Sequence, residues 1–400
     1  MHVFLHDFGG YPFPLDLSRT LARRGHEVTH AWCSSLDTNP GGRHDRLPSD
    51  PPSLRLVPVD LGSPLAKSNY IRRWREERRY GRLLSGLVEQ TRPDVVVSAN
   101  TPLDAQGSIV DSTQRLGIPF VFWVQDLIGM AASTLLPRRL PVLGHAVGRH
   151  YVAYEKRLLR RSQAVVPITD DFVPVLASAG IAPSRITTIE NWAPIDRLPV
   201  RPKDNPWACE NGLADCMVFL YTGTMATKHD PDTIVLLAEH MRGRDDVRIV
   251  VVSHGPGAEH LEAARASRGL ANLVVKGYQD AARLPDVLGA ADVLVAILNV
   301  DASRFSVPSK VLAYLCASRP LLLAVPEENL ASRIVIRERA GLVAPPDDVP
   351  AFLGAASTLL DQPALRLELG RNGRRFAETA FDRERIADRF ESVLAGARVA

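Results

Sequence analysis

Short runs of Val, Ile, Leu and Phe alternate with stretches of helical periodicity along this chain, and this alternation constrains the fold more than any other feature. A strand-like run at residues 2–6 is followed by the turn cluster Asp7-Phe8-Gly9-Gly10. A helical pattern then runs from Leu15 to a stop at Gly25, and a second strand-like run covers residues 26–32. This is a βαβ unit, which implies a parallel sheet with right-handed crossovers.

The alternation occurs twice along the chain. Further strand-like runs lie at residues 94–98, 119–124 and 164–168, and then at 217–222, 247–253, 273–275, 293–296 and 320–324. Near-continuous apolar runs of this kind suit parallel strands that are covered on both faces. A polar, proline-bearing stretch at 194–215 separates the two series and is interpreted as a linker. Since 400 residues exceed one ordinary core, we predict an α/β fold of two doubly wound domains, at residues 1–193 and 216–379.

Composition excludes several classes of protein. The net charge of +3 is too close to balance for a nucleic-acid binder. The four cysteines include no C-x-x-C pair, which disfavours a zinc site or a disulfide framework and indicates a reducing compartment. No apolar stretch is long enough to span a membrane, and the first residues do not resemble a signal peptide. The expectation is a cytoplasmic, enzyme-sized protein.

Open parallel sheets bind ligands beyond the carboxyl ends of their strands, so the residues after the strands are the candidate site. In the second half, the loop Gly223-Thr224-Met225-Ala226-Thr227-Lys228 allows close backbone approach and offers the Lys228 charge to a phosphate. An ordinary turn with a solvated lysine explains it equally well. Two further loops, around Gly255 and around Tyr278, follow the next strands, and main-chain groups near Tyr278 suit a nucleobase edge.

The segment FSVPSKVLAYL, residues 305–315, is the most informative one in the second half. Pro308 is predicted at the start of a helix, where its missing N–H costs nothing. Amides before such a helix suit a diphosphate, to which Ser309 and Lys310 add a hydroxyl and a charge. The alternative is a normally capped core helix, with Leu312 and Leu315 facing inward.

In the first half, Gly9 and Gly10 permit close ligand approach at the first strand end, although a tight turn alone also explains them. Asp126 directly follows the strand that ends in Trp123-Val124-Gln125, which places a carboxylate at the edge of the sheet. Catalysis and capping of the following helix are equally good explanations of Asp126.

Together these positions resemble the bacterial family-four glycosyltransferases. The opening MHVFLHDFGGYPFPLDLSRTLARRGHEV matches that family's Gly-Gly loop, helix and "L-A-x-x-G-H-E-V". The similarity continues, in order, through Ile189-Glu190-Asn191-Trp192, Tyr221-Thr222-Gly223-Thr224…Lys228, Val307-Pro308-Ser309-Lys310…Tyr314-Leu315…Arg319-Pro320 and Ala340-Gly341-Leu342-Val343. The Pro-Ser-Lys form of the motif is most similar to that of surface-polysaccharide sugar transferases.

The resemblance implies the GT-B fold: two Rossmann-like domains with an interdomain cleft, the donor on the C-terminal domain and the acceptor on the N-terminal one. It implies a last helix, at about 380–400, that packs back on the first domain. It also implies a metal-independent, retaining transfer of a hexose or N-acetylhexosamine from a nucleotide sugar, UDP-linked by family analogy, with no cofactor. The residues assigned to the donor are Gly10, Thr224, Lys228, Gly255, Tyr278, Ser306, Val307, Pro308, Ser309 and Lys310. The catalytic candidates are Asp126 and Lys228, and the acceptor side comprises Gly9, Gly10 and Asp126.

One departure from the family pattern concerns two glutamates, with seven residues between them, that many relatives carry around the Pro-Ser-Lys segment. The corresponding positions here are Phe305 and Ala313, so both carboxylates are missing. This leaves open how the donor ribose and sugar are held. A non-catalytic sugar-nucleotide-binding partner protein and a nucleotide-sugar epimerase of the same fold are therefore retained as alternatives. A NAD oxidoreductase is disfavoured, because the first turn lacks G-x-G-x-x-G.

The segment 67–82 contains seven Lys or Arg residues interleaved with Tyr70, Ile71, Trp74 and Tyr80. As a helix, it would suit an anionic lipid surface and hence a lipid-linked glycan acceptor at the inner membrane face. The alternative is a solvated basic face with a few packed aromatics, which leaves a small natural-product acceptor open.

Overall fold

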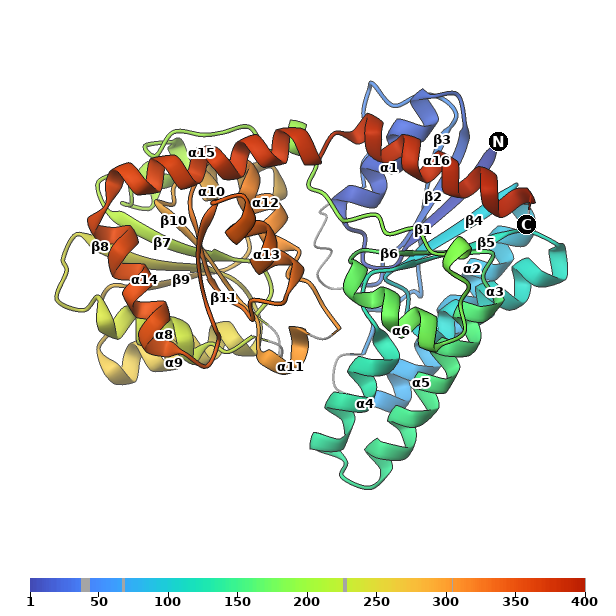
Figure 1. Ribbon diagram of the computed structural model, residues 1–400, viewed down its shortest axis with the longest axis horizontal. Coiled ribbons are helices and arrows are strands. Elements are labelled where there is room, and N and C mark those ends of the chain that lie inside the picture. Colours follow the sequence, from blue (N-terminus) through green and yellow to red (C-terminus); the bar gives the residue numbers. More distant parts are fainter. Residues whose placement is uncertain (37–43, 67–68, 226–228, 304, 400) are drawn as a thin grey trace. The chain divides into compact units, whose positions relative to one another are not determined.

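The computed structural model describes residues 1–36, 44–66, 69–225, 229–303 and 305–399. Their contacts divide the chain into two compact units (Figure 1). Unit 1 comprises residues 1–191 together with 382–400, and unit 2 comprises residues 192–381. The chain therefore leaves unit 1, completes unit 2 and then returns to unit 1.

Unit 1 is a six-stranded parallel sheet covered by helices on both faces. Its strands are β1 (His2–Asp7), β2 (Glu27–Cys33), β3 (Leu54–Val59), β4 (Val95–Ala99), β5 (Phe120–Val124) and β6 (Ala164–Pro167). Its helices are α1 (Pro12–Arg23), α2 (Tyr70–Thr91), α3 (Leu103–Leu116), α4 (Ile128–Arg139), α5 (Leu143–Arg161), α6 (Val173–Ser178) and α16 (Arg383–Val399). Helix α1 packs against α16, whereas α3 packs against both α2 and α5 (Figure 1).

Unit 2 repeats this architecture around a second six-stranded parallel sheet. Its strands are β7 (Met217–Thr222), β8 (Val247–Val252), β9 (Leu273–Lys276), β10 (Val293–Ile297), β11 (Leu321–Ala324) and β12 (Gly341–Ala344). Its helices are α7 (Pro206–Glu210), α8 (Asp232–His240), α9 (Pro256–Arg268), α10 (Leu284–Gly289), α11 (Val300–Ser303), α12 (Lys310–Cys316), α13 (Leu330–Arg337), α14 (Val349–Asp361) and α15 (Pro363–Ala380). One core cluster joins the strands to α8, α9 and α14.

The strand order is the same in both units. The first sheet runs β3-β2-β1-β4-β5-β6, and the second runs β12-β11-β10-β7-β8-β9, which is the same order counted from the other edge. Each unit therefore has the Rossmann-like, doubly wound topology that the sequence predicted. In this topology the chain reverses direction between the first and fourth strands, and ligands bind outside the carboxyl ends at that point.

The proline-bearing segment 194–215, which the sequence analysis interpreted as a linker, packs on unit 2. Trp207 is buried, and its ring nitrogen donates to Gln279 Oε1 at 2.9 Å. Lys203 forms an ion pair of 2.7 Å with Asp292, and Asn205 donates to the carbonyl of Asp286. A proline-rich composition signals a connection, but it does not reveal the buried tryptophan contacts.

Helix α16 completes the core of unit 1. Ile386, Phe390 and Leu394 are buried, and the Phe390 ring lies 4.7 Å from the ring of Trp123 on β5. At the rim, the Arg24 guanidinium bonds to the carboxylates of Glu384, Asp388 and Glu391. None of the described helices in either unit is both long enough and apolar enough to span a membrane.

Candidate functional site

In unit 2, the crossover point of the sheet lies between β7 and β10, and the residues that follow β7 are held firmly there. Gly223 has a φ of +105°, a conformation that favours glycine, and its N–H donates to the Val252 carbonyl. The Tyr314 hydroxyl, on α12, accepts from the Thr222 N–H at 2.9 Å. The buried Tyr221 hydroxyl donates to the Thr224 carbonyl at 3.0 Å. Helix α12 thus fixes the end of β7 directly.

Lys310 reaches this strand end from the first position of α12. Its ammonium nitrogen lies 3.4 Å from the centre of the Tyr221 ring, a cation–π contact. A β-carbon placed on Gly223 would lie 3.8 Å from the same nitrogen. The structure therefore brings two predicted features together, the lysine of the Pro-Ser-Lys segment and the glycine loop after β7. This places a positive charge at the crossover point of the sheet.

Thr224 and Tyr278 also meet. The Thr224 hydroxyl lies 2.6 Å from the Tyr278 hydroxyl, and both side chains are exposed. The His254 ring lies 6.1 Å from the Tyr278 ring. Gly255, with a φ of +93°, begins α9 beside it. Three strand-end loops of unit 2, those after β7, β8 and β9, therefore lie together at one edge of the sheet.

The Pro-Ser-Lys segment differs from the prediction at its helix start. The helix α12 begins at Lys310 with Ser309 as its N-cap, so Pro308 lies before the helix rather than in its first turn. The Val311 N–H bonds to the Pro308 carbonyl, a tighter turn than that of an α-helix, and this delays the helix by two residues. Leu312 and Leu315 are buried, as the alternative of a core helix required.

The residues before Pro308 are not equally accessible. Ser306 is buried, and its carbonyl accepts from the Asn329 side-chain amide at 3.0 Å. Val307 is half-buried and Ser309 is exposed.

Phe305, which stands where many relatives carry a glutamate, is only 4% exposed, so an apolar side chain fills that position from within the core. Ala313, at the second such position, is half-buried on α12. Lys228 lies outside the described residues.

In unit 1, the strongest polar constellation surrounds Asp7 at the end of β1. Asp7 is fully buried, and its carboxylate accepts from the Asn100 amide at 2.7 Å and from the Tyr11 N–H. Asn100 follows β4 with a φ of 53°. Burial raises the pKa of Asp7 to about 7, although the bonds from Asn100 and from the loop amides of Tyr11, Gly9 and Gly10 lower it.

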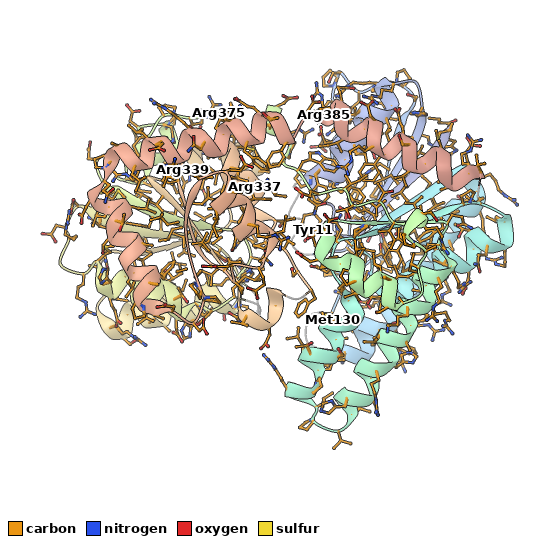
Figure 2. All side chains as sticks on the ribbon, viewed as in Figure 1. Tyr11, Met130, Arg337, Arg339, Arg375 and Arg385 are labelled. Carbon is orange, nitrogen blue, oxygen red and sulfur yellow. The ribbon has the colours of Figure 1, made fainter. Side chains whose placement is uncertain are left out.

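The Gly9–Gly10 loop is organised by this carboxylate. The Gly10 N–H also bonds to the Asp7 carbonyl, and Gly10 has a φ of +62°. A β-carbon on Gly9 would lie 2.3 Å from an atom of the Tyr11 ring, so the tyrosine lies against the first glycine (Figure 2 labels Tyr11). The loop is a tight turn, and it also lies at the crossover point between β1 and β4.

Asp126 follows β5 at the same edge of the unit 1 sheet and is half-buried. It does not cap the following helix: the N-cap of α4 is Leu127, and no side chain caps it locally. Instead, Glu155 of α5 accepts from the Gly129 N–H at 3.1 Å. Burial raises the pKa of Glu155 to about 7, with a smaller contribution from the Asp126 charge. The capping explanation of Asp126 is therefore wrong, and its carboxylate remains available at the sheet edge.

Gln125, just before Asp126, exchanges side-chain hydrogen bonds with Asn191, one of them at 3.2 Å. Through this pair, Asn191 of the segment Ile189-Glu190-Asn191-Trp192 holds the residue that follows β5. Gly9, Gly10 and Asp126 thus share one edge of the unit 1 sheet, whereas every other donor-binding candidate that the structure describes lies in unit 2.

Sequence reasoning missed four site residues that the structure adds: Asp7, Asn100, Tyr221 and Tyr314. Asp7 was noted only as part of a turn cluster, and its position directly after a buried strand was the available signal. Tyr221 and Tyr314 stand within the motifs that carry the family resemblance, but their roles depend on how α12 lies over β7, which the sequence does not reveal. Within the described ranges, no three His, Cys, Asp or Glu side chains converge in the manner of a metal site.

Two family models match the chain, one on each unit. Residues 9–192 match the glycosyl transferase 4-like domain, and residues 217–362 match the glycosyl transferases group 1 domain. A search of curated proteins found no match. Neither the epimerase nor the non-catalytic hypothesis is favoured by these matches.

Solved structures with the same fold cover nearly the whole chain. Sucrose-phosphate synthase from Thermosynechococcus elongatus is 17% identical, with a TM-score of 0.74 and 98% of each chain covered. HepE of Anabaena in complex with UDP-glucose is 12% identical, with a TM-score of 0.73 and 99% of each chain covered. WaaG, a glycosyltransferase involved in lipopolysaccharide biosynthesis, is 18% identical, with a TM-score of 0.68, and covers 97% of this chain and 99% of its own. At these identities the likeness shows the fold.

Proposed function

The chain is a glycosyltransferase of the GT-B fold, with a glycosyl transferase 4-like domain followed by a group 1 domain, and from this we propose the reaction that it catalyses. It transfers a hexose or N-acetylhexosamine from a nucleoside diphosphate sugar to a hydroxyl of its acceptor. The transfer proceeds with retention of the anomeric configuration and without a resident metal ion. The observation that carries this proposal is the position of the Lys310 ammonium beside Gly223, at the crossover point of the unit 2 sheet.

The donor diphosphate binds at this edge of unit 2. Lys310 supplies a fixed charge, and Lys228, from the loop that follows Gly223, supplies a second. Main-chain amides around Ser309 and Gly255 complete the anion site, and Tyr278 contacts the nucleobase. The missing glutamates leave ribose and sugar hydroxyls to backbone groups and to Ser309, since Phe305 is buried.

Charge development explains why two lysines serve this reaction. The bond between the anomeric carbon and the diphosphate oxygen breaks, and its electron pair stays on the leaving diphosphate. Fixed positive groups stabilise that charge as it develops. The sugar acquires oxocarbenium character, and the acceptor oxygen bonds to the anomeric carbon from the face that the diphosphate leaves. The acceptor hydroxyl gives its proton to the departing phosphate oxygen, while Asp126 orients the acceptor.

A uridine nucleotide is the first donor to test. The solved structures of HepE include complexes with UDP and with UDP-glucose, and these share the fold of this chain. The acceptor is a lipid-linked glycan or a small natural product, bound on the side of Gly9, Gly10 and Asp126.

Peripheral membrane contact through residues 67–82 supports the lipid-linked acceptor. Lys67 and Ser68 lie outside the described residues, and the rest begins helix α2. Tyr70, Ile71 and Trp74 are exposed there, by 51%, 67% and 40%, whereas Tyr80 is fully buried. Helix α2 therefore presents a basic, aromatic-rich face at its start and packs on the domain at its middle. Co-sedimentation with anionic vesicles tests this contact, and an unbound protein would point to the small natural-product acceptor.

The decisive experiment incubates the protein with a panel of UDP-sugars, with and without an acceptor extract. Glycosylated product that forms only with the extract supports transfer, and its anomeric configuration by NMR tests retention. Turnover without acceptor would indicate an epimerase or hydrolase, and binding without turnover a partner protein. Activity that survives chelation of divalent metals is expected. Lys228→Ala should lower the transfer rate about tenfold or more in folded protein.

A further inference from the structure

Helices α4 and α5 form a hairpin that extends away from the sheet of unit 1 (Figure 1). The two helices approach closely because α5 presents glycines to α4. A β-carbon on Gly148 would lie 2.6 Å from the Ser133 α-carbon, and one on Gly144 would lie 2.6 Å from the Leu136 carbonyl. Backbone packing of this kind leaves little freedom between the helices, so the hairpin holds its tip as a rigid extension.

The tip of the hairpin is apolar and exposed. Leu140, Val142 and Leu143 are exposed by 42%, 88% and 60%, and Pro141 between them is exposed as well. Behind the tip, every side chain of α4 from Met130 to Pro137 is only half-buried, and Met130 lies at the base of the hairpin (Figure 2). A contiguous apolar surface at the end of a rigid extension indicates an interaction site.

The charged side chains of the hairpin itself have one sign. Residues 127–154 contain no Asp or Glu, whereas they contain Arg138, Arg139 and Arg149. Arg149 is exposed, as is His145. The next acidic residue, Glu155, is buried against the start of α4. The hairpin therefore combines an apolar tip with basic flanks, which is the pattern of a segment that enters the interface of an anionic bilayer.

The start of α2 lies beside this hairpin. The Trp74 ring nitrogen donates to Asp104 at 3.1 Å, and the Tyr151 hydroxyl of α5 donates to the same carboxylate at 2.7 Å. Asp104 thereby links the exposed aromatic end of α2 to the middle of α5. Both surfaces belong to unit 1, and each combines exposed apolar side chains with nearby basic residues.

We propose that the tip of the α4–α5 hairpin, residues 140–143, inserts into the interfacial region of an anionic lipid bilayer. Leu140, Val142 and Leu143 enter the boundary between headgroups and acyl chains, and the exposed Arg138 and Arg149 contact lipid phosphates. A second copy of the chain fits this surface poorly, since a stable protein interface takes about 20–30 residues from each partner. The inference goes beyond the proposed function and is independent of the sugar transferred.

The first test is co-sedimentation with vesicles of phosphatidylglycerol and phosphatidylcholine in equal parts. The double variant Val142→Glu, Leu143→Glu should bind about tenfold less than the wild type, because each carboxylate opposes both insertion and attraction. The double variant Val142→Ser, Leu143→Ser removes the apolar side chains without adding charge. It should also bind the vesicles less than the wild type does. The matched control is Ile336→Glu, Leu367→Glu on unit 2, where the side chains are exposed by 50% and 59%, and it should bind as the wild type does.

A second readout separates insertion from surface attraction. An environment-sensitive fluorophore on Val142→Cys, with the accessible Cys209 and Cys216 changed to Ser, should shift to the blue when vesicles are added. The same fluorophore on Leu367→Cys should not shift.

Three results would overturn the proposal: a wild type that ignores the anionic vesicles, a glutamate variant that binds as well as the wild type, or no shift at position 142. A wild-type dimer that dissociates in the glutamate variant, measured by light scattering without lipid, would instead assign the tip to contact between copies. Calorimetric UDP binding by the same variants tests the donor site separately, so failure of one proposal is distinguishable from failure of the other.

Discussion

The Lys310 ammonium lies 3.4 Å from the centre of the Tyr221 ring, and this contact joins the first turn of α12 to the carboxyl end of strand β7. The two residues are far apart in the sequence, yet the crossover of the unit 2 sheet brings them together. The charge is consequently held at the point where a doubly wound sheet binds its ligand.

Removing this charge should weaken binding of the donor. We expect Lys310→Ala to raise the Kd for UDP about tenfold, equivalent to about 1.4 kcal/mol, because one fixed cation near the diphosphate is lost. Isothermal calorimetry measures the change, and Lys156→Ala on α5 serves as the control with unchanged affinity. A purely structural Lys310 would give a lower melting temperature with the same Kd, which contradicts the prediction.

Asp7 should make the stability of unit 1 depend on pH. Its pKa in the folded chain is about 7, against 3.8 for an ordinary aspartate. The folded state therefore holds the proton more tightly than the unfolded state. The contribution of the Asp7 proton to the free energy of unfolding is fully present below about pH 4. It is lost as pH rises through 7, at about 1.4 kcal/mol per unit of pH within that window.

The variant Asp7→Asn remains neutral and should lack this dependence. Its free energy of unfolding should change less between pH 5 and pH 8 than that of the wild type, as measured by denaturant titration. The difference between the two curves isolates Asp7 from Glu155, whose pKa is also raised. Asp245→Asn, at an exposed position, should leave the pH profile unaltered. Parallel curves for wild type and Asp7→Asn would refute the burial argument.

The close approach of α4 and α5 should tolerate no added methyl group at Gly148. We expect Gly148→Ala to lower the free energy of unfolding by about 1–3 kcal/mol, because the new β-carbon would meet the Ser133 backbone. Gly86→Ala on α2 is the matched control, since nothing lies within 4 Å of its new methyl group. That change should stabilise the helix by about 1 kcal/mol or less. Equal effects at the two glycines would mean that the hairpin is loosely packed.

Truncation of Phe390 should destabilise unit 1 through its last helix. Phe390 is fully buried against Trp123, so Phe390→Ala should cost about 3–5 kcal/mol. Tryptophan fluorescence during urea unfolding follows the change, and the native emission should also move to longer wavelength as water reaches Trp123. Leu367→Ala, on the exposed side of α15, is expected to alter stability by less than about 0.5 kcal/mol. An unchanged midpoint for Phe390→Ala would show that α16 is dispensable.

The interior strands of both sheets, together with the edge strands β6 and β9, could be predicted from the sequence because their apolar runs are continuous; β7 was predicted at its observed bounds. The two strands that were missed, β3 and β12, lie at the outer edges of their sheets. β3 carries Arg55 and Pro58, which interrupt the apolar pattern, and β12 has only four residues. Edge strands pack on fewer neighbours, so their sequences are less constrained.

The candidate site could be predicted less completely. Lys310 and the Gly223 loop were each identified from local sequence, but their approach depends on the orientation of α12, which packing sets. The sequence gives Asp126 two alternative roles, and only the fold shows that Glu155, from a different helix, caps the start of α4. Local patterns identify which residues are chemically able to act, whereas their partners come from distant segments.

The return of the chain to unit 1 after residue 381 has a consequence for its synthesis. A ribosome makes residues 383–399 only after every strand of unit 2. Trp123 therefore lacks its contact with Phe390 until the segment between them has been translated. Unit 1 is incomplete throughout that time. The two segments that build unit 1 are thus synthesised before and after the whole of unit 2, so the packing of unit 1 is completed only once unit 2 has been made.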